Sequence, residues 1–306
     1  CGKTTTLRMI AGLDAPTSGR ILIDGHDVTA LGPAERNVSM VFQSYALFPH
    51  MNVIENVGYG LSVSGVSKAA TATRARAALD SVGLTGYDER LPSELSGGQQ
   101  QRVAVARSLV LEPSVLLFDE PLSNLDARLR RSMREEIRAL QQRLKLTVAY
   151  VTHDQSEALA VSDQIIVMNA GEIAQAGTPA QLYEAPRSVF VAGFMGEAML
   201  FDGVADADGR VALGPLVLRV ANPPPPGAVK VAVRPEAWQI VAPGAAGTIA
   251  GALVKRAYLG SFQELTVETA LGAIFVVSSD VERSWQIGEA LALRLAEKGV
   301  AVLPAG

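Results

Sequence analysis

The stretch LSGGQQQR at residues 95–102, together with VLLFDE at residues 115–120, decides the fold of this chain. Ser96 is a good N-cap for a helix, and Gly97 and Gly98 leave the first backbone N–H groups uncovered by any Cβ. Such a helix start attracts anions, and phosphate in particular. A capped core helix without a ligand is the alternative, but so long a motif seldom arises by chance. We therefore predict a phosphate-facing helix start here.

The second stretch is an apolar strand that ends in two carboxylates. Residues 114–118 (SVLLF) have the apolar character of a buried parallel strand, and Asp119 and Glu120 follow them. Carboxylates beside a buried strand are costly unless they serve a cation or a proton transfer. Neighbouring strand residues point to opposite faces, so the two acids need not share a role. We assign Asp119 to Mg²⁺ and Glu120 to polarising an attacking water.

The chain opens with CGKTT, which matches the second half of the phosphate-binding pattern G-x-x-x-x-G-K-[ST]. We predict a helix over residues 3–11, from which Lys3 reaches the β- and γ-phosphates and the Thr4 hydroxyl ligates Mg²⁺. Taken alone, GKT is better explained by an ordinary glycine-initiated helix, and it gains weight only from the two stretches above. Because the first half of the pattern is missing, we expect the sequence to lack its natural N-terminus.

Polar residues also stand at the ends of two further predicted strands. Residues 37–42 (NVSMVF) precede Gln43, and residues 147–151 (TVAYV) end shortly before His153. Ligands bind at the carboxyl ends of the strands in open α/β sheets, so Gln43 and His153 are candidate site residues. An exposed aromatic loop after Gln43 would suit contact with a partner. The alternative is local packing of Tyr45, Leu47 and Phe48, which we favour when this stretch is taken alone.

A long helix is predicted to begin at residues 123–126 (SNLD), because apolar residues recur behind it at helical spacing. Its other face carries five arginines, which we interpret as a solvated surface rather than a nucleic-acid patch. These are Arg128, Arg130, Arg131, Arg134 and Arg138. The net charge of −4 likewise provides no electrostatic footprint for nucleic acid.

Length and composition set the remaining limits. With 306 residues, of which 48% are hydrophobic, the chain has room for two domains with large cores. No apolar run reaches the roughly 18 residues of a membrane span, so a membrane role requires a partner. Strands alternate with helices up to about residue 195, and only short strand-like runs follow, as in a small β-barrel or sandwich. We predict an α/β domain over residues 1–195 and an all-β domain over residues 196–306.

Taken together, GKTT, the Gln43 loop, LSGGQQQR, LLFDEP, SNLD and VTHD resemble the nucleotide-binding subunit of an ABC transporter over residues 1 to about 195. Residues 233–236 (VRPE) and 258–261 (YLGS) resemble the regulatory TOBE domain of bacterial import ATPases. The resemblance implies a P-loop NTPase fold, with a RecA-like parallel sheet and a helical subdomain, followed by a small OB-like domain.

The same resemblance implies an ATPase that acts as a head-to-tail homodimer around ATP and Mg²⁺. The phosphates would be held by one subunit through Cys1, Gly2, Lys3, Thr4 and Thr5. The γ-phosphate would be closed off by the other subunit through Ser96, Gly97, Gly98 and Gln99.

Four further roles follow from the resemblance. Gln43 would touch Mg²⁺ or the lytic water, and Glu120 would act as the base. His153 would contact the γ-phosphate, and Asp126 would signal across the dimer. The family stacks adenine on an aromatic residue upstream of the phosphate loop, and that segment is absent here. We therefore expect this sequence to bind ATP poorly and the full-length subunit to be active.

The resemblance also implies partners and a place in the cell. A membrane permease would dock near residues 43–51, a periplasmic binding protein would act indirectly, and the subunit would lie peripherally on the cytoplasmic face of the inner membrane. In its overall residue pattern, the sequence resembles the ATPases that serve importers of ferric iron, polyamines or aminoethylphosphonate, and among these cargoes we favour ferric iron. The alternatives are a soluble ABC ATPase of translation or DNA repair, or a binding module whose ATPase is degenerate; Asp119, Glu120 and His153 argue against degeneracy.

Overall fold

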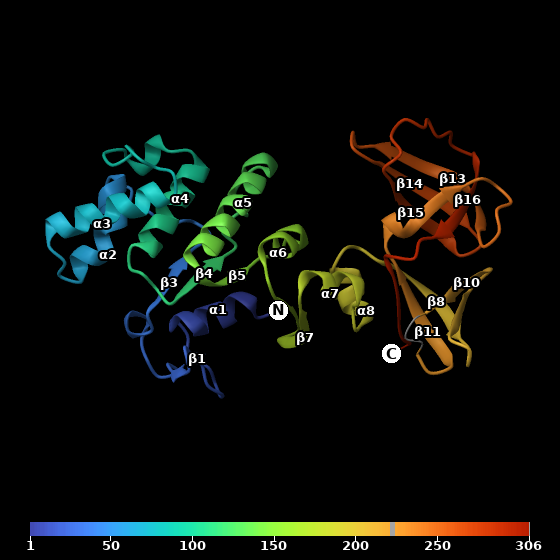
Figure 1. Ribbon diagram of the computed structural model, residues 1–306, viewed down its shortest axis with the longest axis horizontal. Coiled ribbons are helices and arrows are strands. Elements are labelled where there is room, and N and C mark those ends of the chain that lie inside the picture. Colours follow the sequence, from blue (N-terminus) through green and yellow to red (C-terminus); the bar gives the residue numbers. More distant parts are fainter. Residues whose placement is uncertain (221–223, 306) are drawn as a thin grey trace. The chain divides into compact units, whose positions relative to one another are not determined.

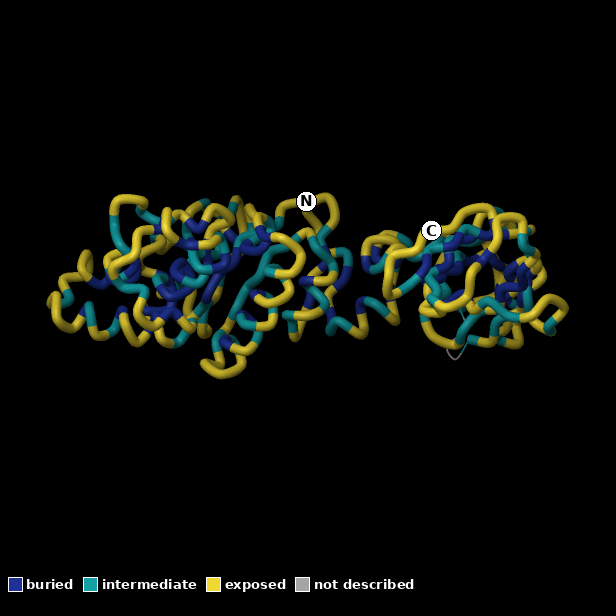
Figure 2. Tube along the Cα trace, turned by 90° about the horizontal axis from the view of Figure 1, so that it is seen from above, coloured by how far each residue is buried: buried dark blue, intermediate teal, exposed yellow. Residues whose placement is uncertain are grey.

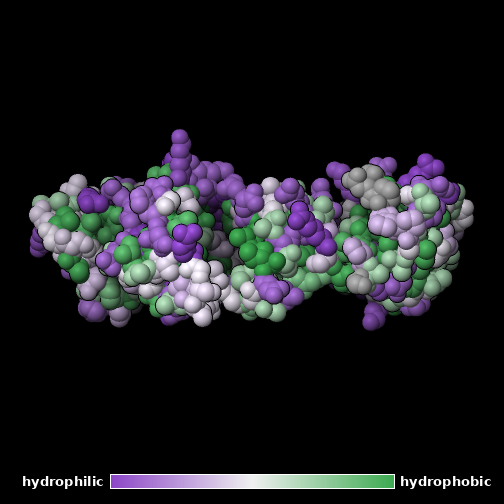
Figure 3. Space-filling view, turned by 90° about the horizontal axis from the view of Figure 1, so that it is seen from below, coloured by the Kyte–Doolittle hydropathy of each residue, from purple (hydrophilic) through white to green (hydrophobic). Residues whose placement is uncertain are grey.

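The computed structural model describes residues 1–220 and 224–305. They form two compact units, Cys1–Val161 and Ser162–Gly306, and each is described by itself (Figure 1). Buried segments lie inside each unit and exposed segments around them (Figure 2). On the face drawn in Figure 3, hydrophilic and hydrophobic residues are interspersed. Within the described ranges, every helix is too short or too polar to cross a membrane.

A three-stranded parallel sheet lies at the centre of the first unit, as the sequence predicts. Its strands are β3 (Val38–Val41), β4 (Val115–Asp119) and β5 (Thr147–Val151), with β4 in the middle. The middle strand is the most apolar of the three because both of its faces are covered. Leu117 packs on one face against helix α1 (Lys3–Ala11), while Phe118 packs on the other with residues of helix α5 (Ala127–Leu144).

The helical part of the first unit consists of α2 (Val53–Val63), α3 (Lys68–Ser81) and α4 (Gly97–Leu109). A turn at Gly65, with φ of +80°, separates α2 from α3. Ser67 caps α3 by accepting a hydrogen bond from the backbone N–H of Ala70. The three helices share a core of fully buried residues, among them Val57, Leu79 and Val103. The shorter elements of this unit are β1 (Leu22–Ile23), β2 (His26–Asp27), the 3₁₀ turns η1 (Pro33–Glu35) and η2 (Pro92–Glu94), and α6 (Gln155–Val161).

The structure decides between the two interpretations of the aromatic loop for Tyr45. The aromatic loop after Gln43 does not expose Tyr45, which is 7% exposed and packs in the same core as Val105 of α4. The backbone of Tyr45 and Ala46 is left-handed, with φ of +59° and +47°, and this turns the Tyr45 ring inward. The packing alternative is therefore the correct one for Tyr45, whereas Gln43 itself is exposed.

The second unit begins with an antiparallel pair of strands and two short helices. Strand β6 (Ile165–Asn169) pairs with β7 (Glu172–Gly177) in a two-stranded sheet of its own, and α7 (Pro179–Glu184) and α8 (Val189–Phe194) follow. Arg234 fixes both helices to the β-strands that come next. Its guanidinium is buried and donates to the carbonyls of Tyr183 and Ala192.

Two five-stranded antiparallel sheets complete the second unit, in agreement with the predicted all-β region. Their orders are β10-β9-β8-β11-β17 and β12-β16-β13-β14-β15. They share one apolar core, in which Val231, Leu253 and Leu265 are fully buried. The strands are β8 (Met199–Ala205), β9 (Arg210–Leu213), β10 (Leu216–Arg219), β11 (Gly227–Val233), β12 (Trp238–Val241), β13 (Ile249–Tyr258), β14 (Gln263–Thr269), β15 (Gly272–Ser278), β16 (Ala290–Leu295) and β17 (Val300–Pro304), with the turn η3 (Pro235–Ala237) before β12.

Candidate functional site

The start of helix α1 lies at the carboxyl ends of β4 and β5. Gly2 precedes the helix with φ of +91°, a left-handed conformation that favours glycine. The Lys3 ammonium donates to the Thr152 carbonyl at 2.9 Å. The Thr4 hydroxyl donates to Oδ1 of Asp119 at 3.2 Å. The packing of α1 on the sheet thus brings the lysine, the hydroxyl and the first carboxylate together, while Cys1 and Thr5 lie exposed beside them.

The second carboxylate of β4 faces the loop after β5. Oε2 of Glu120 lies 3.1 Å from Nδ1 of His153, and the Glu120 N–H donates to the Val151 carbonyl at 3.0 Å. Glu120 adopts φ of +47°, a left-handed conformation that costs a non-glycine residue about 1–2 kcal/mol. Such local strain concentrates at functional sites, where the surrounding structure enforces it.

Gln43 is connected to this group through Ser123, a residue that sequence reasoning did not single out as part of the site. The Gln43 amide donates to the Ser123 hydroxyl at 3.1 Å, and that hydroxyl donates to the Glu120 carbonyl at 2.9 Å. Asn124 in turn donates to the Gln43 carbonyl at 3.1 Å. The SNLD motif was the sequence signal that could have identified Ser123 as a site residue. Its first two residues, Ser123 and Asn124, hold the Gln43 loop against the acidic end of β4.

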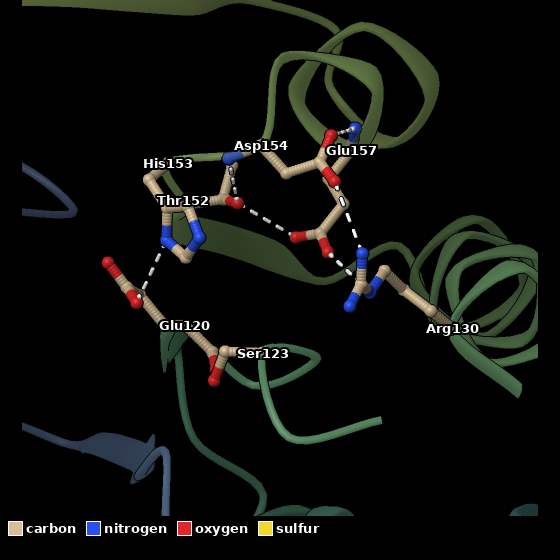
Figure 4. A pocket seen from close by; sticks show the side chains of 7 residues that line it. All are labelled: Glu120, Ser123, Arg130, Thr152, His153, Asp154 and Glu157. Atoms are coloured by element: carbon tan, nitrogen blue, oxygen red, sulfur yellow. Dashed lines mark hydrogen bonds and ion pairs between the residues drawn. The ribbon is translucent and has the colours of Figure 1, made fainter. Parts of the chain in front are cut away.

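A cavity of about 40 Å³ opens beside the Glu120–His153 pair. Figure 4 shows its lining: Glu120, Ser123, Arg130, Thr152, His153, Asp154 and Glu157. Arg130 lies over the acidic side of this cavity, 3.6 Å from Asp154 and 3.8 Å from Glu157. The interpretation of Arg130 as part of a solvated face is therefore wrong, because these two carboxylates hold it against α6.

The LSGGQ segment forms the start of α4 as predicted. Ser96 caps the helix by accepting from the Gln99 N–H at 3.4 Å, and its own N–H donates to the Gln99 side chain at 2.9 Å. The Gln99 amide also donates to the Tyr87 hydroxyl at 3.1 Å. A Cβ on Gly98 would come within 2.9 Å of Leu129, so this glycine also permits close packing against α5.

The two predicted phosphate-binding helix starts form hydrogen bonds to different parts of the first unit. Over the part of the chain that the structure describes, the hydrogen bonds of Ser96 and Gln99 join them to each other, to the following turn of α4 and to Tyr87. Asp126 caps α5, where its side chain accepts from the Leu129 N–H at 2.9 Å. One copy of the chain therefore presents two separate cradles of backbone N–H groups.

Comparison with known proteins identifies the family. The sequence pattern of the ABC transporter family matches residues 1–123, and that of the TOBE domain matches residues 231–303. The chain is 58% identical to an Fe(3+) ions import ATP-binding protein of Rhizobium meliloti, over 99% of this chain and 87% of the relative. Relatives of the same description in Rhizobium etli and Vibrio cholerae are 56% and 54% identical, over 88% and 77% of their lengths. The chain belongs to the ATP-binding proteins of ABC transporters.

This membership confirms the predicted fold class and the ATPase activity. The protein is the ATP-binding and ATP-hydrolysing subunit of an ABC importer. The match to the ABC transporter family over residues 1–123 includes the start of α1, the Gln43 loop, the LSGGQ segment and the acidic end of β4. It therefore covers most of the candidate site residues. The roles of the individual residues remain predictions.

Proposed function

We propose that this ABC ATPase drives the uptake of ferric iron through a membrane permease. The observation that carries the motor function is the convergence of Lys3, Thr4, Asp119, Glu120 and His153 at one sheet edge. This convergence supports a site in which phosphate contacts and a carboxylate base would act within one reaction volume. The ferric-iron assignment is supported by the names of relatives that match nearly the whole chain.

In the proposed reaction, Lys3 and the N–H groups at the start of α1 hold the β- and γ-phosphates. Glu120 takes the proton of the attacking water, and His153 contacts the γ-phosphate while it orients Glu120. The backbone N–H of Glu120 bonds to the Val151 carbonyl, so the backbone that carries the carboxylate is already held in place.

Mg²⁺ is the proposed metal of this site, with Thr4, Asp119 and Gln43 as its protein contacts. The Thr4 hydroxyl and the Asp119 carboxylate already lie 3.2 Å apart, and they are the hard oxygen donors that Mg²⁺ prefers. Among the described residues, no group of three or more His, Cys, Asp or Glu side chains could hold a metal. Mg²⁺ takes few protein ligands and binds together with phosphates. When bound, it would neutralise the developing charge on the phosphates.

A head-to-tail dimer would bring the two separate cradles onto the same nucleotide. Ser96, Gly97, Gly98 and Gln99 of one subunit would then face the phosphates held by residues 1–5 of the other, with Asp126 at the junction. Support comes from the hydrogen bonds of the two helix starts. Lys3 and Thr4 bond to Thr152 and Asp119, whereas the side chains of Ser96 and Gln99 bond within the LSGGQ segment and to Tyr87, among the described residues.

Residues 43–51 are the proposed contact with the permease, which would place the subunit peripherally on the cytoplasmic face of the membrane. Gln43 is exposed and connected through Ser123 to Glu120, so a movement of this loop would reach the proposed base. A periplasmic binding protein would deliver the cargo to the permease.

Uptake by a deletion strain tests the cargo. We expect the strain to lose transport of radiolabelled ferric iron and to regain it with the intact gene, but not with a Glu120→Gln variant. Loss of polyamine or aminoethylphosphonate uptake, with ferric-iron uptake unchanged, would refute the assignment.

A further inference from the structure

The Thr152–His153 segment carries two of the proposed contacts but belongs to no helix or strand. It lies between β5 and α6. The Thr152 carbonyl accepts from Lys3, and the His153 ring faces Glu120. A segment without a ladder of backbone hydrogen bonds needs other interactions to hold it in one conformation.

Glu157 of α6 provides these interactions. Its side chain is 4% exposed, and its Oε2 accepts from the Thr152 hydroxyl at 2.8 Å (Figure 4). The same Oε2 accepts from the Tyr150 hydroxyl at 3.1 Å. The Thr152 hydroxyl oxygen also accepts from the Asp154 N–H at 2.9 Å. Thr152, which precedes His153, therefore bonds directly to the Glu157 carboxylate. Asp154, which follows His153, is connected to that carboxylate through the Thr152 hydroxyl.

A buried carboxylate is costly without a compensating charge, and Arg130 supplies that charge. Its Nε lies 3.8 Å from Glu157, and its Nη2 donates to the Leu125 carbonyl at 3.0 Å. Burial first, and then the charge of Glu157, raise the pKa of the Tyr150 hydroxyl, which keeps this group a hydrogen-bond donor. Arg130 and Glu157 thus link the start of α5 to the segment that contains His153.

We propose that Glu157 is a positioning residue for ATP hydrolysis, which holds the Thr152–His153 segment where Lys3 and His153 meet the nucleotide. The inference rests on the proposed roles of Lys3 and His153. A purely structural role of Glu157 would not require it to act together with Thr152. The positioning role does, because Glu157 acts through the Thr152 hydroxyl, so substitutions of the two residues should not have independent effects on kcat.

The test compares kcat for ATP hydrolysis in the intact protein among Glu157→Gln, Thr152→Val and the double variant. Thr152→Val removes the hydrogen bond to Glu157, while Glu157→Gln weakens it by replacing the ionised acceptor with an amide oxygen and leaves Arg130 without its counter-charge. We expect each change to lower kcat about tenfold. The double variant should lose about the same factor, because the shared interaction can be lost only once. Glu135→Gln is the matched control, since that side chain is 67% exposed on α5, and it should leave kcat unchanged.

An unchanged kcat in Glu157→Gln, or a loss of about a hundredfold in the double variant, would overturn the proposal. Should Glu157→Gln fail to fold, Thr152→Val is measured with and without His153→Ala. The effect of Thr152→Val should largely disappear in the His153→Ala background, and a full effect there would contradict the proposal. His153→Ala alone distinguishes failure of the proposed function from failure of this inference. An unchanged kcat in His153→Ala would refute the proposed role of His153. A lowered kcat in His153→Ala, together with a normal kcat in Glu157→Gln, would refute only the positioning role of Glu157.

Discussion

Nδ1 of His153 lies 3.1 Å from Oε2 of Glu120, although 33 positions separate the two residues in the chain. The register of the parallel sheet explains this proximity. Asp119 at the end of β4 lies beside Val151 at the end of β5, so the residues that follow each strand emerge at the same edge. The Glu120 N–H then bonds to the Val151 carbonyl and sets the direction of the carboxylate. The position of the proposed base is thus a consequence of strand pairing.

In the intact subunit, replacement of Glu120 by Gln should stop hydrolysis and preserve nucleotide binding. The amide keeps the size of the side chain but cannot take a proton, and a general base contributes about 10²–10⁴-fold to a rate. We expect kcat to fall by about that factor and an ATP-bound dimer to accumulate, as measured by steady-state hydrolysis and by size-exclusion chromatography with ATP. Glu112→Gln, at a side chain that is 79% exposed, is the control. A normal rate in Glu120→Gln would mean that the base lies elsewhere.

Ser123 should matter although it carries no charge. Its hydroxyl joins the Gln43 amide to the Glu120 carbonyl, so Ser123→Ala releases the Gln43 side chain. Loss of one such hydrogen bond is worth about 1 kcal/mol, and we expect a roughly fivefold lower kcat. Ser44→Ala, at an exposed residue next to Gln43, is the control. Equal rates for both variants and the unmodified protein would show that the bridge is dispensable.

Much of this site could be predicted because its residues stand at strand ends or helix starts. Asp119, Glu120 and His153 follow apolar strands, and Ser96 caps a helix, so local patterns were sufficient. Arg130 and Tyr45 could not be placed in this way. Arg130 lies on a face rich in arginine, and only the fold brings Asp154 and Glu157 over it. Tyr45 is turned into the core by two successive left-handed residues, which no periodicity in the sequence indicates.

A methyl group at Gly98 would require the Leu129 side chain to shift. A Cβ there would lie 2.9 Å from Leu129, and overpacking of this kind costs about 1–3 kcal/mol. We therefore expect Gly98→Ala to lower the melting temperature of the first unit and to weaken ATP-dependent dimerisation. Gly193→Ala is the matched control, because a Cβ at that helical glycine meets nothing within 4 Å. A melting temperature equal to that of the control variant would contradict the packing argument.

The second unit should lose stability at alkaline pH through Tyr183. Burial, followed by the hydrogen bond to Glu236, raises the pKa of the Tyr183 hydroxyl to about 12, from an ordinary value of 10.0. The folded state therefore retains this proton more tightly than the unfolded state. The contribution to stability is fully present below pH 10 and disappears as the pH rises toward 12. We expect Tyr183→Phe to flatten the decline of the melting temperature of this unit over that range. Tyr258→Phe, at a side chain that is 63% exposed, should leave the decline unchanged, and equal slopes for the Tyr183→Phe variant and the unmodified protein would refute the assignment.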